Sequence, residues 1–272
     1  MNSNTFEQRM RALEYFHSLR VLPGAWIVLR VDGRSFSRFT AQRFKKPFDE
    51  TFRDYMTRTA QALLQELHGL YAYTESDEIS VLFPREWDAF DREVEKLVSI
   101  SASIAAVTFT HACGQMVSFD SRIWVGVDRQ DVVDYFRWRM ADAERCSLNG
   151  WCYWTLRGDG QNVVQATATL RGKSTAYKNE LLFQHGINYN DLPVWQRRGM
   201  GVYWERYPKA GYDPIHQTET TTMRRRVAID LELPMKDAYA AFIGGILDAA
   251  EAEKEDQILR RRQKKRGSHE PT

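Results

Sequence analysis

The chain has 272 residues, of which 43% are hydrophobic and 27% charged, so it can form a sizeable core in one large domain or two small ones. It has no run of about 18 apolar residues and no apolar signal core in its first twenty residues, and we expect a cytoplasmic protein without a membrane span. Its three cysteines form no C-x-x-C pair, which argues against a disulfide framework or a structural zinc site.

The positive charge is concentrated at the C-terminus. The formal net charge is +2, but residues 260–266 (RRRQKKR) hold six of the 38 basic residues, and without residues 260–272 the net charge is −3. Composition alone therefore gives little support for nucleic-acid binding, and any such site must be a local patch. We expect residues 251–272 to form a charged, disordered tail.

Apolar periodicity predicts an alternation of helices and strands in the first half of the chain. The expected elements are a helix over 5–19, a buried strand over 26–31, a polar loop over 34–47, a helix over 49–68, strands over 70–73 and 79–83, a helix over 88–110 and a strand over 119–127. From residue 26 onward this is a β-α-β-β-α-β order. That order is typical of the ferredoxin-like split βαβ unit, which is also the core of polymerase palm domains.

The second half of the chain is expected to add helices and a C-terminal α/β extension, so the fold class is α+β. Helices are predicted over 130–148 and 237–259, with a polar loop or hairpin over 213–224. We interpret the Trp and Tyr cluster at 151–154 as core or subunit interface. The division expected is 1–130 for the palm-like core, 131–250 for the extension and 251–272 for the tail.

Two acidic positions are candidates for a metal site. Asp32 ends the first strand, and Asp77 lies in the turn Glu75-Ser76-Asp77-Glu78 of the following hairpin. The topology can bring both carboxylates to one end of the sheet, where they could bridge two Mg²⁺ ions, and the bare backbone of Gly33 would let its carbonyl approach a metal. Either aspartate taken alone is equally well explained as the cap of a turn.

Several basic residues could bind phosphates near these carboxylates. Lys46 precedes a helix start, where backbone amides also favour anions. Arg92 and Lys96 lie four residues apart on the next helix, although Lys96 could equally pair with Glu93 or Glu95. Neither a P-loop nor a G-x-G-x-x-G motif is present, and the six histidines have no metal-ligand spacing.

The chain resembles the tRNA(His) guanylyltransferase family and its bacterial and archaeal relatives, the 3′–5′ reverse polymerases. The resemblance covers about residues 5–245. The motifs that carry it are VDGRSF at 31–36, Lys46-Pro47, Tyr73 with Ser76-Asp77-Glu78, FDSR at 119–122, YFRWR at 135–139 with Ala141-Asp142, KNELLF at 178–183, and INYN at 187–190 with Leu192-Pro193.

The resemblance implies a palm-like fold with a two-magnesium site, ATP and GTP or other nucleoside triphosphates as substrates, tRNA as partner, and a homotetramer built as a dimer of dimers. By resemblance, the metal ligands are Asp32, Gly33 and Asp77, with Glu78 supporting the catalytic pair. The implied nucleotide contacts are Gly33, Arg34, Ser35, Phe36, Ser37, Lys46, Ser76, Asp77, Arg92 and Lys96. Lys178 and Asn179 would touch the tRNA or merely shape a helix surface, and Arg197 and Arg198 would clamp its backbone or form a solvated face.

Two departures from the family pattern bear on the substrate. Ser37 stands where members commonly have His, and residues 144–147 (ERCS) replace a His-Ile-Asn-Asn block that goes with strict tRNA(His) specificity. We therefore expect template-directed 3′–5′ addition of nucleotides to truncated tRNA 5′ ends. The first alternative is addition of a single guanylate at position −1 of tRNA(His), and the second is a palm-fold binding module that lacks catalysis.

Overall fold

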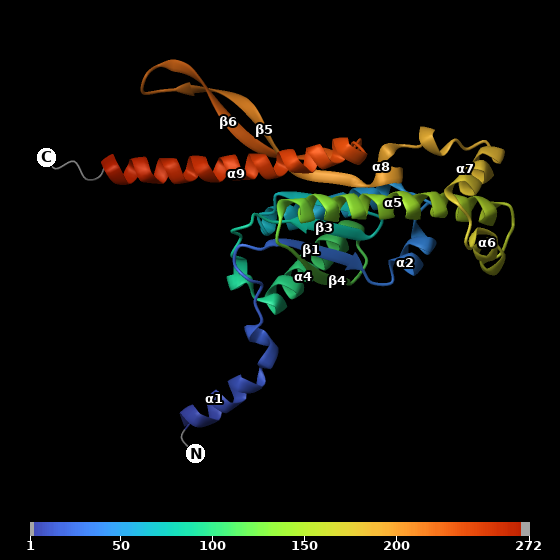
Figure 1. Ribbon diagram of the computed structural model, residues 1–272, viewed down its shortest axis with the longest axis horizontal. Coiled ribbons are helices and arrows are strands. Elements are labelled where there is room, and N and C mark those ends of the chain that lie inside the picture. The colour runs from blue at the N-terminus through green and yellow to red at the C-terminus, as the bar shows by residue number, and fades with distance from the viewer. Residues whose placement is uncertain (1–2, 268–272) are drawn as a thin grey trace.

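The computed structural model of the protein describes residues 3–267, with side chains described for residues 5–255. One six-stranded antiparallel sheet has helices on both faces (Figure 1). The elements are α1 (Ser3–Leu13), η1 (Tyr15–Ser18), β1 (Trp26–Gly33), α2 (Phe36–Arg43), α3 (Glu50–Glu66), β2 (Tyr71–Glu75), β3 (Glu78–Leu82), η2 (Ala89–Arg92), α4 (Val94–Cys113), β4 (Phe119–Gly126), α5 (Arg129–Gly158), α6 (Val163–Leu170), α7 (Thr175–Gln184), η3 (Tyr189–Asp191), α8 (Val194–Arg198), β5 (Met200–Asp213), β6 (Thr218–Asp230) and α9 (Lys236–Gly267).

The sheet has the strand order β4-β1-β3-β2-β5-β6. β1 is buried along most of its length, and its side chains alternate between the two faces of the sheet. Leu29 and Val31 pack into a core with α3 and α4, whereas Trp26 and Val28 pack into a second core with α5 and α9. The continuous apolar run WIVLRV therefore reflects a strand that is covered on both faces.

The predicted β-α-β-β-α-β order from residue 26 onward is confirmed for the strands and long helices, with two corrections. From the split βαβ order, the first strand of the hairpin was expected near β1, but the neighbour of β1 is the second strand, β3. The polar loop predicted over 34–47 contains α2 instead. Phe36 and Thr40 lie one turn apart on α2 and are both buried, and the Phe36 ring packs 5.2 Å from that of Phe109.

The ends of the chain also differ from expectation. The first helix, predicted over 5–19, ends at Leu13 and is followed by η1; α1 projects from the body (Figure 1), and its Phe6 and Leu13 are exposed. The tail predicted to be disordered continues as α9 to Gly267; residues 268–272 lie outside the described part of the chain. The helix predicted over 130–148 extends to Gly158.

Of the described helices, only α4 has the length and apolar composition of a membrane-crossing helix, with a mean hydropathy of 1.3. A core helix of a globular domain passes the same test. α4 packs on α3, β1 and β4, and its Leu97, Ala105 and Phe109 are buried.

The second half of the chain extends the same sheet. β5 pairs with β2, and β5 and β6 continue as a long two-stranded ribbon that leaves the body, so the hairpin alternative for 213–224 is confirmed (Figure 1). The far end of α5 forms a third hydrophobic cluster with α6 and α7 around Cys152 and Leu182.

Candidate active site

The turn between β2 and β3 brings Asp77 to the end of β1. It contains two residues, Ser76 and Asp77, and Ser76 adopts a left-handed conformation (φ 48°), as short hairpin turns require. The Gly33 amide donates to the Asp77 carbonyl oxygen at 3.0 Å. Asp32 and Asp77, predicted to meet from the topology, are thus neighbours at one end of the sheet.

Asp32 lies between two other carboxylates in the ladder, opposite Glu78 on β3 and Asp120 on β4. Burial raises the pKa of Asp32, and the charge of Asp120 adds to the rise. Burial also raises the pKa of Asp77, with a further contribution from Asp32. The Ser76 hydroxyl donates to Asp77 Oδ1 at 3.1 Å and opposes that rise. The two carboxylates repel each other, which is the condition that a cation would relieve.

Gly33 is required for a reason that the sequence did not indicate. A Cβ atom at this position would lie 2.5 Å from ring carbons of Phe36, well inside van der Waals contact. The absence of a side chain therefore lets the Phe36 ring pack against the end of β1.

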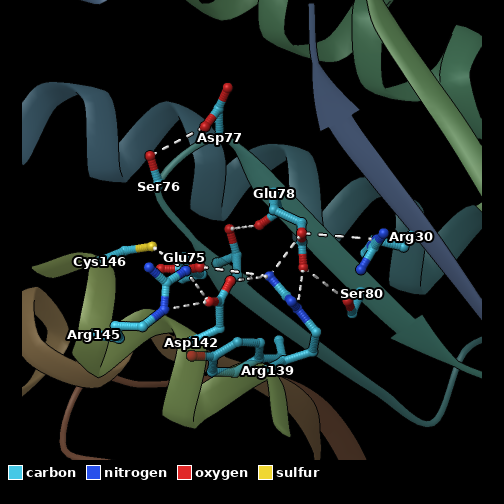
Figure 2. A network of polar contacts seen from close by, with 12 residues as sticks. Arg30, Glu75, Ser76, Asp77, Glu78, Ser80, Arg139, Asp142, Arg145 and Cys146 are labelled. Atoms are coloured by element: carbon cyan, nitrogen blue, oxygen red, sulfur yellow. Dashed lines mark hydrogen bonds and ion pairs between the residues drawn. The ribbon is translucent and has the colours of Figure 1, made fainter. Parts of the chain in front are cut away.

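Glu78 differs from Asp32 and Asp77 because it is held by a buried arginine of α5. Arg139 Nε donates to Glu78 Oε1 at 2.7 Å, and a second guanidinium nitrogen donates to Glu78 Oε2 at 2.9 Å. The same guanidinium contacts Asp142 at 3.2 Å and Glu75 at 3.7 Å. Figure 2 shows these side chains converging on Arg139, while the Asp77 carboxylate points away from them.

This arrangement separates two acidic groups with different tasks. Glu78 is neutralised by a bidentate ion pair, which suits a supporting role. Asp77 remains available to a ligand. The importance of Arg139 was not predicted, although the spacing of Arg139 and Asp142 on one helix face was a signal of an ion pair.

A pocket of about 530 Å³ opens beside Asp77. Its polar lining includes Ser37, Lys46 and Ser76, three of the predicted nucleotide contacts. Lys46 Nζ donates to the Thr40 hydroxyl at 2.6 Å. Burial lowers the pKa of the Lys46 ammonium, and the charge of Asp77 opposes that fall. The Lys46 ammonium, the hydroxyls of Ser37 and Ser76 and the N-terminus of α2 therefore lie around the same pocket as Asp77.

The rest of the pocket lining is aromatic and comes from both halves of the chain. The rings that line it are those of Phe36, Phe44, Phe48, Phe52, Tyr153, Trp154 and Trp195. The interpretation of 151–154 as core or interface is therefore wrong for Trp154, which faces this pocket. Sequence reasoning missed Trp154 and Trp195 because no local pattern indicates which aromatic side chains will share a cavity.

Some predicted nucleotide contacts do not lie in this pocket. Arg34 and Ser35 line a separate depression together with Phe36. Arg92 is buried at the opposite end of β1, and its guanidinium donates to the carbonyls of Val21, Ala25, Arg85 and Trp87. Lys96 pairs with Glu93 at 2.9 Å, the alternative that the sequence left open. The fold of the single chain thus does not bring Arg92 or Lys96 to the site, because internal partners hold both.

The predicted tRNA contacts also differ in how far their side chains are held by partners inside the protein. Arg198 lies 3.2 Å from Glu144 and donates to the Leu233 carbonyl, so its guanidinium is held inside the protein. Asn179 donates to the Thr175 carbonyl of its own helix at 3.1 Å. Lys178 and Arg197 are half-buried, on α7 and α8, and Arg197 Nε donates to the Leu192 carbonyl at 2.9 Å.

Within the described residues, no group of three or more His, Cys, Asp or Glu side chains is arranged to hold a metal ion. The carboxylates of Asp32 and Asp77 and the carbonyl of Gly33 nevertheless offer hard oxygen donors. Mg²⁺ is usually bound by one or two carboxylates together with substrate phosphates and water, so the residues present fit this ion.

Comparison with known proteins identifies the same family over both halves of the chain. The family model described as tRNAHis guanylyltransferase matches residues 7–130, and the model of the Thg1 C terminal domain matches residues 130–268. A probable tRNA(His) guanylyltransferase of Drosophila melanogaster is 37% identical over 191 residues, which are 66% of this chain and 67% of the relative. The corresponding protein of Dictyostelium discoideum is 31% identical over 77% of this chain and 86% of its own length.

Solved structures give the same result. A bacterial tRNA(His) guanylyltransferase (Thg1)-like protein in complex with GTP superposes with a TM-score of 0.70 at 26% identity. The match covers 89% of this chain and 99% of that one. The tRNA(His) guanylyltransferase of Saccharomyces cerevisiae has a TM-score of 0.64 at 27% identity, over 70% of this chain and 90% of its own.

Proposed function

Because the chain belongs to the tRNA(His) guanylyltransferase family and is therefore a nucleotidyltransferase, we propose that it adds guanylate to the 5′ end of tRNA(His). The observation that supports this most directly is that Asp32 and Asp77 lie next to each other beside a pocket. One end of that pocket carries Lys46 and the hydroxyls of Ser37 and Ser76, and aromatic rings line much of the rest. The names of the relatives favour this narrower reaction over the template-directed repair of truncated tRNAs that we expected from the sequence.

The proposal includes a polymerase-type palm. The strand order β4-β1-β3-β2, with α3 and α4 on one face, supports a ferredoxin-like core. Asp32, Asp77 and the Gly33 carbonyl would hold two Mg²⁺ ions, which would neutralise charge on the phosphates and on the attacking and leaving oxygens. Their mutual repulsion without a cation supports this assignment.

The residues of the pocket would orient the nucleoside triphosphate. Lys46 and Ser76 would donate to its phosphate oxygens, and the N-terminus of α2, at Phe36 and Ser37, would offer backbone amides that lack partners in the first turn of any helix. The aromatic part of the pocket would hold the base. This placement sets the phosphates next to Asp77 and the base towards Trp154 and Trp195.

The proposed chemistry is two successive displacements at phosphorus. An oxygen of the tRNA 5′-phosphate attacks the α-phosphorus of ATP, forming a 5′-adenylylated end and releasing pyrophosphate. The 3′-hydroxyl of GTP then attacks the 5′-phosphorus of the tRNA, losing its proton and releasing AMP. Water finally attacks the α-phosphorus of the new 5′-triphosphate end, which releases pyrophosphate and leaves a 5′-monophosphate. The role of this chain's residues is mainly to position the reactants and stabilise charge.

The tRNA, which we propose to be held partly by Lys178 and Arg197, would approach from the α7–α8 side of the pocket. Template-directed 5′-end repair remains a second candidate. It is favoured by residues 144–147, where Glu144 pairs with Arg198 and Arg145 pairs with Asp142 in place of the family's His-Ile-Asn-Asn block. We also propose a cytoplasmic homotetramer, which light scattering of the purified protein would test.

One assay tests the proposed reaction. The purified chain is given Mg²⁺, ATP, all four nucleotides and either full-length tRNA(His) or a tRNA that lacks its first nucleotide, both with 5′-monophosphates. We expect one guanylate on tRNA(His). The expected product is lost in Asp32→Asn and Asp77→Asn but kept in Glu66→Gln, a control at an exposed position at the end of α3. Extension of the truncated tRNA alone would instead support the repair reaction, and extension by the Asp77 variant would refute the metal assignment.

A further inference from the structure

Arg157 is a cation in the wall of the aromatic pocket that has no partner. It lies in the last turn of α5 and lines the pocket with Trp154. Its Nε atom is shielded from solvent, and no hydrogen-bond acceptor meets it among the described residues. Two other pocket cations are held: Lys46 donates to Thr40, and Arg53 pairs with Asp54. Because buried donors in native proteins are almost always satisfied, the guanidinium is positioned for a group that the chain itself does not supply.

The place of Arg157 in the pocket indicates which part of a nucleotide it would meet. The carboxylates, Ser76 and Lys46 define the phosphate end. On α5, Arg157 follows Trp154 by three residues, so the two side chains lie on the same side of the helix and both line the pocket. Lys46 Nζ already lies 5.9 Å from the centroid of the Trp154 ring, so the pocket passes from phosphate donors to aromatic rings there.

An arginine beside aromatic rings suits a purine that stacks and presents acceptors at its edge. Guanine presents two acceptors side by side, O6 and N7, which match the paired donors of a guanidinium. Adenine presents N7 next to the N6 amino group, which is itself a donor and would oppose one guanidinium N–H. A pocket with Arg157 at its aromatic end therefore distinguishes the two purines.

We propose that Arg157 is a specificity-determining residue that donates to O6 and N7 of the guanine of bound GTP. This inference rests on the proposed function, because it places the triphosphate at Asp77 and Lys46. It extends that function by assigning the selection of guanine to a residue outside the acidic centre. Trp154 would stack on the base and keep water from the contact.

Equilibrium binding of four triphosphates in the presence of Mg²⁺ tests the proposal. GTP and inosine triphosphate carry both O6 and N7, 7-deaza-GTP lacks N7, and ATP carries the opposing amino group. We expect Arg157→Ala to weaken binding of GTP and inosine triphosphate roughly 5- to 100-fold while changing ATP binding less than about threefold. Wild-type protein should bind 7-deaza-GTP more weakly than GTP, and the variant should remove most of that difference.

Two further variants make the outcome decisive. Arg157→Lys keeps the positive charge but not the paired donors, so it should lose most of the preference for GTP over ATP. Arg171→Ala removes an exposed arginine outside the pocket lining and should change nothing. Equal weakening of all four triphosphates would overturn the proposal, because it would mean a phosphate contact, and so would an unchanged preference for GTP in both Arg157 variants. A wild-type protein that binds none of the four would refute the proposed function as well.

Discussion

At the scale of single residues, Glu75 shows how strongly the acidic turn is affected by its surroundings. Its side chain is largely buried at the end of β2, 3.7 Å from the Arg139 guanidinium. Burial and the charge of Glu78 together raise the pKa of Glu75 to about 8, although Arg139 opposes the rise. At neutral pH the Glu75 carboxyl is therefore mostly protonated. It adds little negative charge next to the Arg139 guanidinium.

This shift predicts a pH-dependent contribution to stability. The native pKa of Glu75 lies above its usual value of 4.5, so the native state favours the protonated form. That contribution is complete below pH 4.5 and is lost as the pH rises through 8. Between pH 5 and pH 8.5, we expect the unfolding free energy of wild type to fall by roughly 4 kcal/mol more than that of Glu75→Gln. Urea unfolding at both pH values measures this. Glu66→Gln, at an exposed position, should follow wild type, and parallel pH profiles for wild type and Glu75→Gln would contradict the prediction.

At the scale of elements, α3 begins at a cap that also shapes the pocket. Asp49 accepts from the Phe52 amide at 3.0 Å and from the Lys45 amide at 2.9 Å. Asp49→Ala should lower the unfolding free energy by about 1 kcal/mol, because two backbone donors lose their acceptor. Denaturant unfolding measures the change. Asp54→Ala, an exposed carboxylate one turn later, should cost less than about half as much. Equal effects of the two substitutions would show that the cap contributes nothing.

A second link between elements is the ion pair that ties α5 to β3. Arg139→Met would leave buried Glu78 with only the longer 3.8 Å contact to Arg30, and we expect a loss of about 3 kcal/mol in unfolding free energy. Adding Glu78→Gln should recover part of this loss, so a double-mutant cycle should give a coupling energy of at least about 1 kcal/mol. The control Arg145→Met removes an exposed partner of Asp142 and should cost under about 1 kcal/mol. A cycle without coupling would show that Arg139 acts through packing alone.

The elements that the sequence predicted are those whose signal is local. β1 has a continuous apolar run, and Asp49 is a cap of ordinary type. α2 was missed because its basic residues obscured the spacing of Phe36 and Thr40, which place one face of that helix in the core. α9 was cut short because charge was interpreted as disorder, although a helix can continue through a charged segment.

The site could be predicted only in part for a related reason. Asp32 and Asp77 were found because hairpin geometry brings a turn to the end of a neighbouring strand. Arg92 was placed at the site because its helix follows that hairpin, yet its partners are the carbonyls of Val21 and Ala25 at the other end of β1. Which carbonyls surround an arginine depends on packing between distant segments, and no spacing in the sequence shows it.

At the scale of the whole molecule, one sheet unites segments that are far apart in the chain. Because β5 pairs with β2, Trp195 and Met200 line the same pocket as Lys46 and Asp77. α5 crosses from Arg139, next to the acidic turn, to Arg157 in the pocket wall. A ligand that fills the pocket would therefore contact both halves of the chain, and its binding energy would stabilise the whole fold and not one element.

Thermal unfolding should report this coupling. GTP at about 100 times its dissociation constant should add roughly 2.7 kcal/mol to the stability of the native state. For a chain of this size that corresponds to an increase in Tm of about 5–10 °C. We expect the increase only when Mg²⁺ and GTP are present together, because the two carboxylates need the phosphates to complete a coordination shell. Asp77→Asn should remove most of the increase, whereas Glu66→Gln, at an exposed position of α3, should keep it. An equal increase in the presence of EDTA would mean that GTP binds without Mg²⁺. It would contradict the proposal that Asp32 and Asp77 hold the phosphates through magnesium.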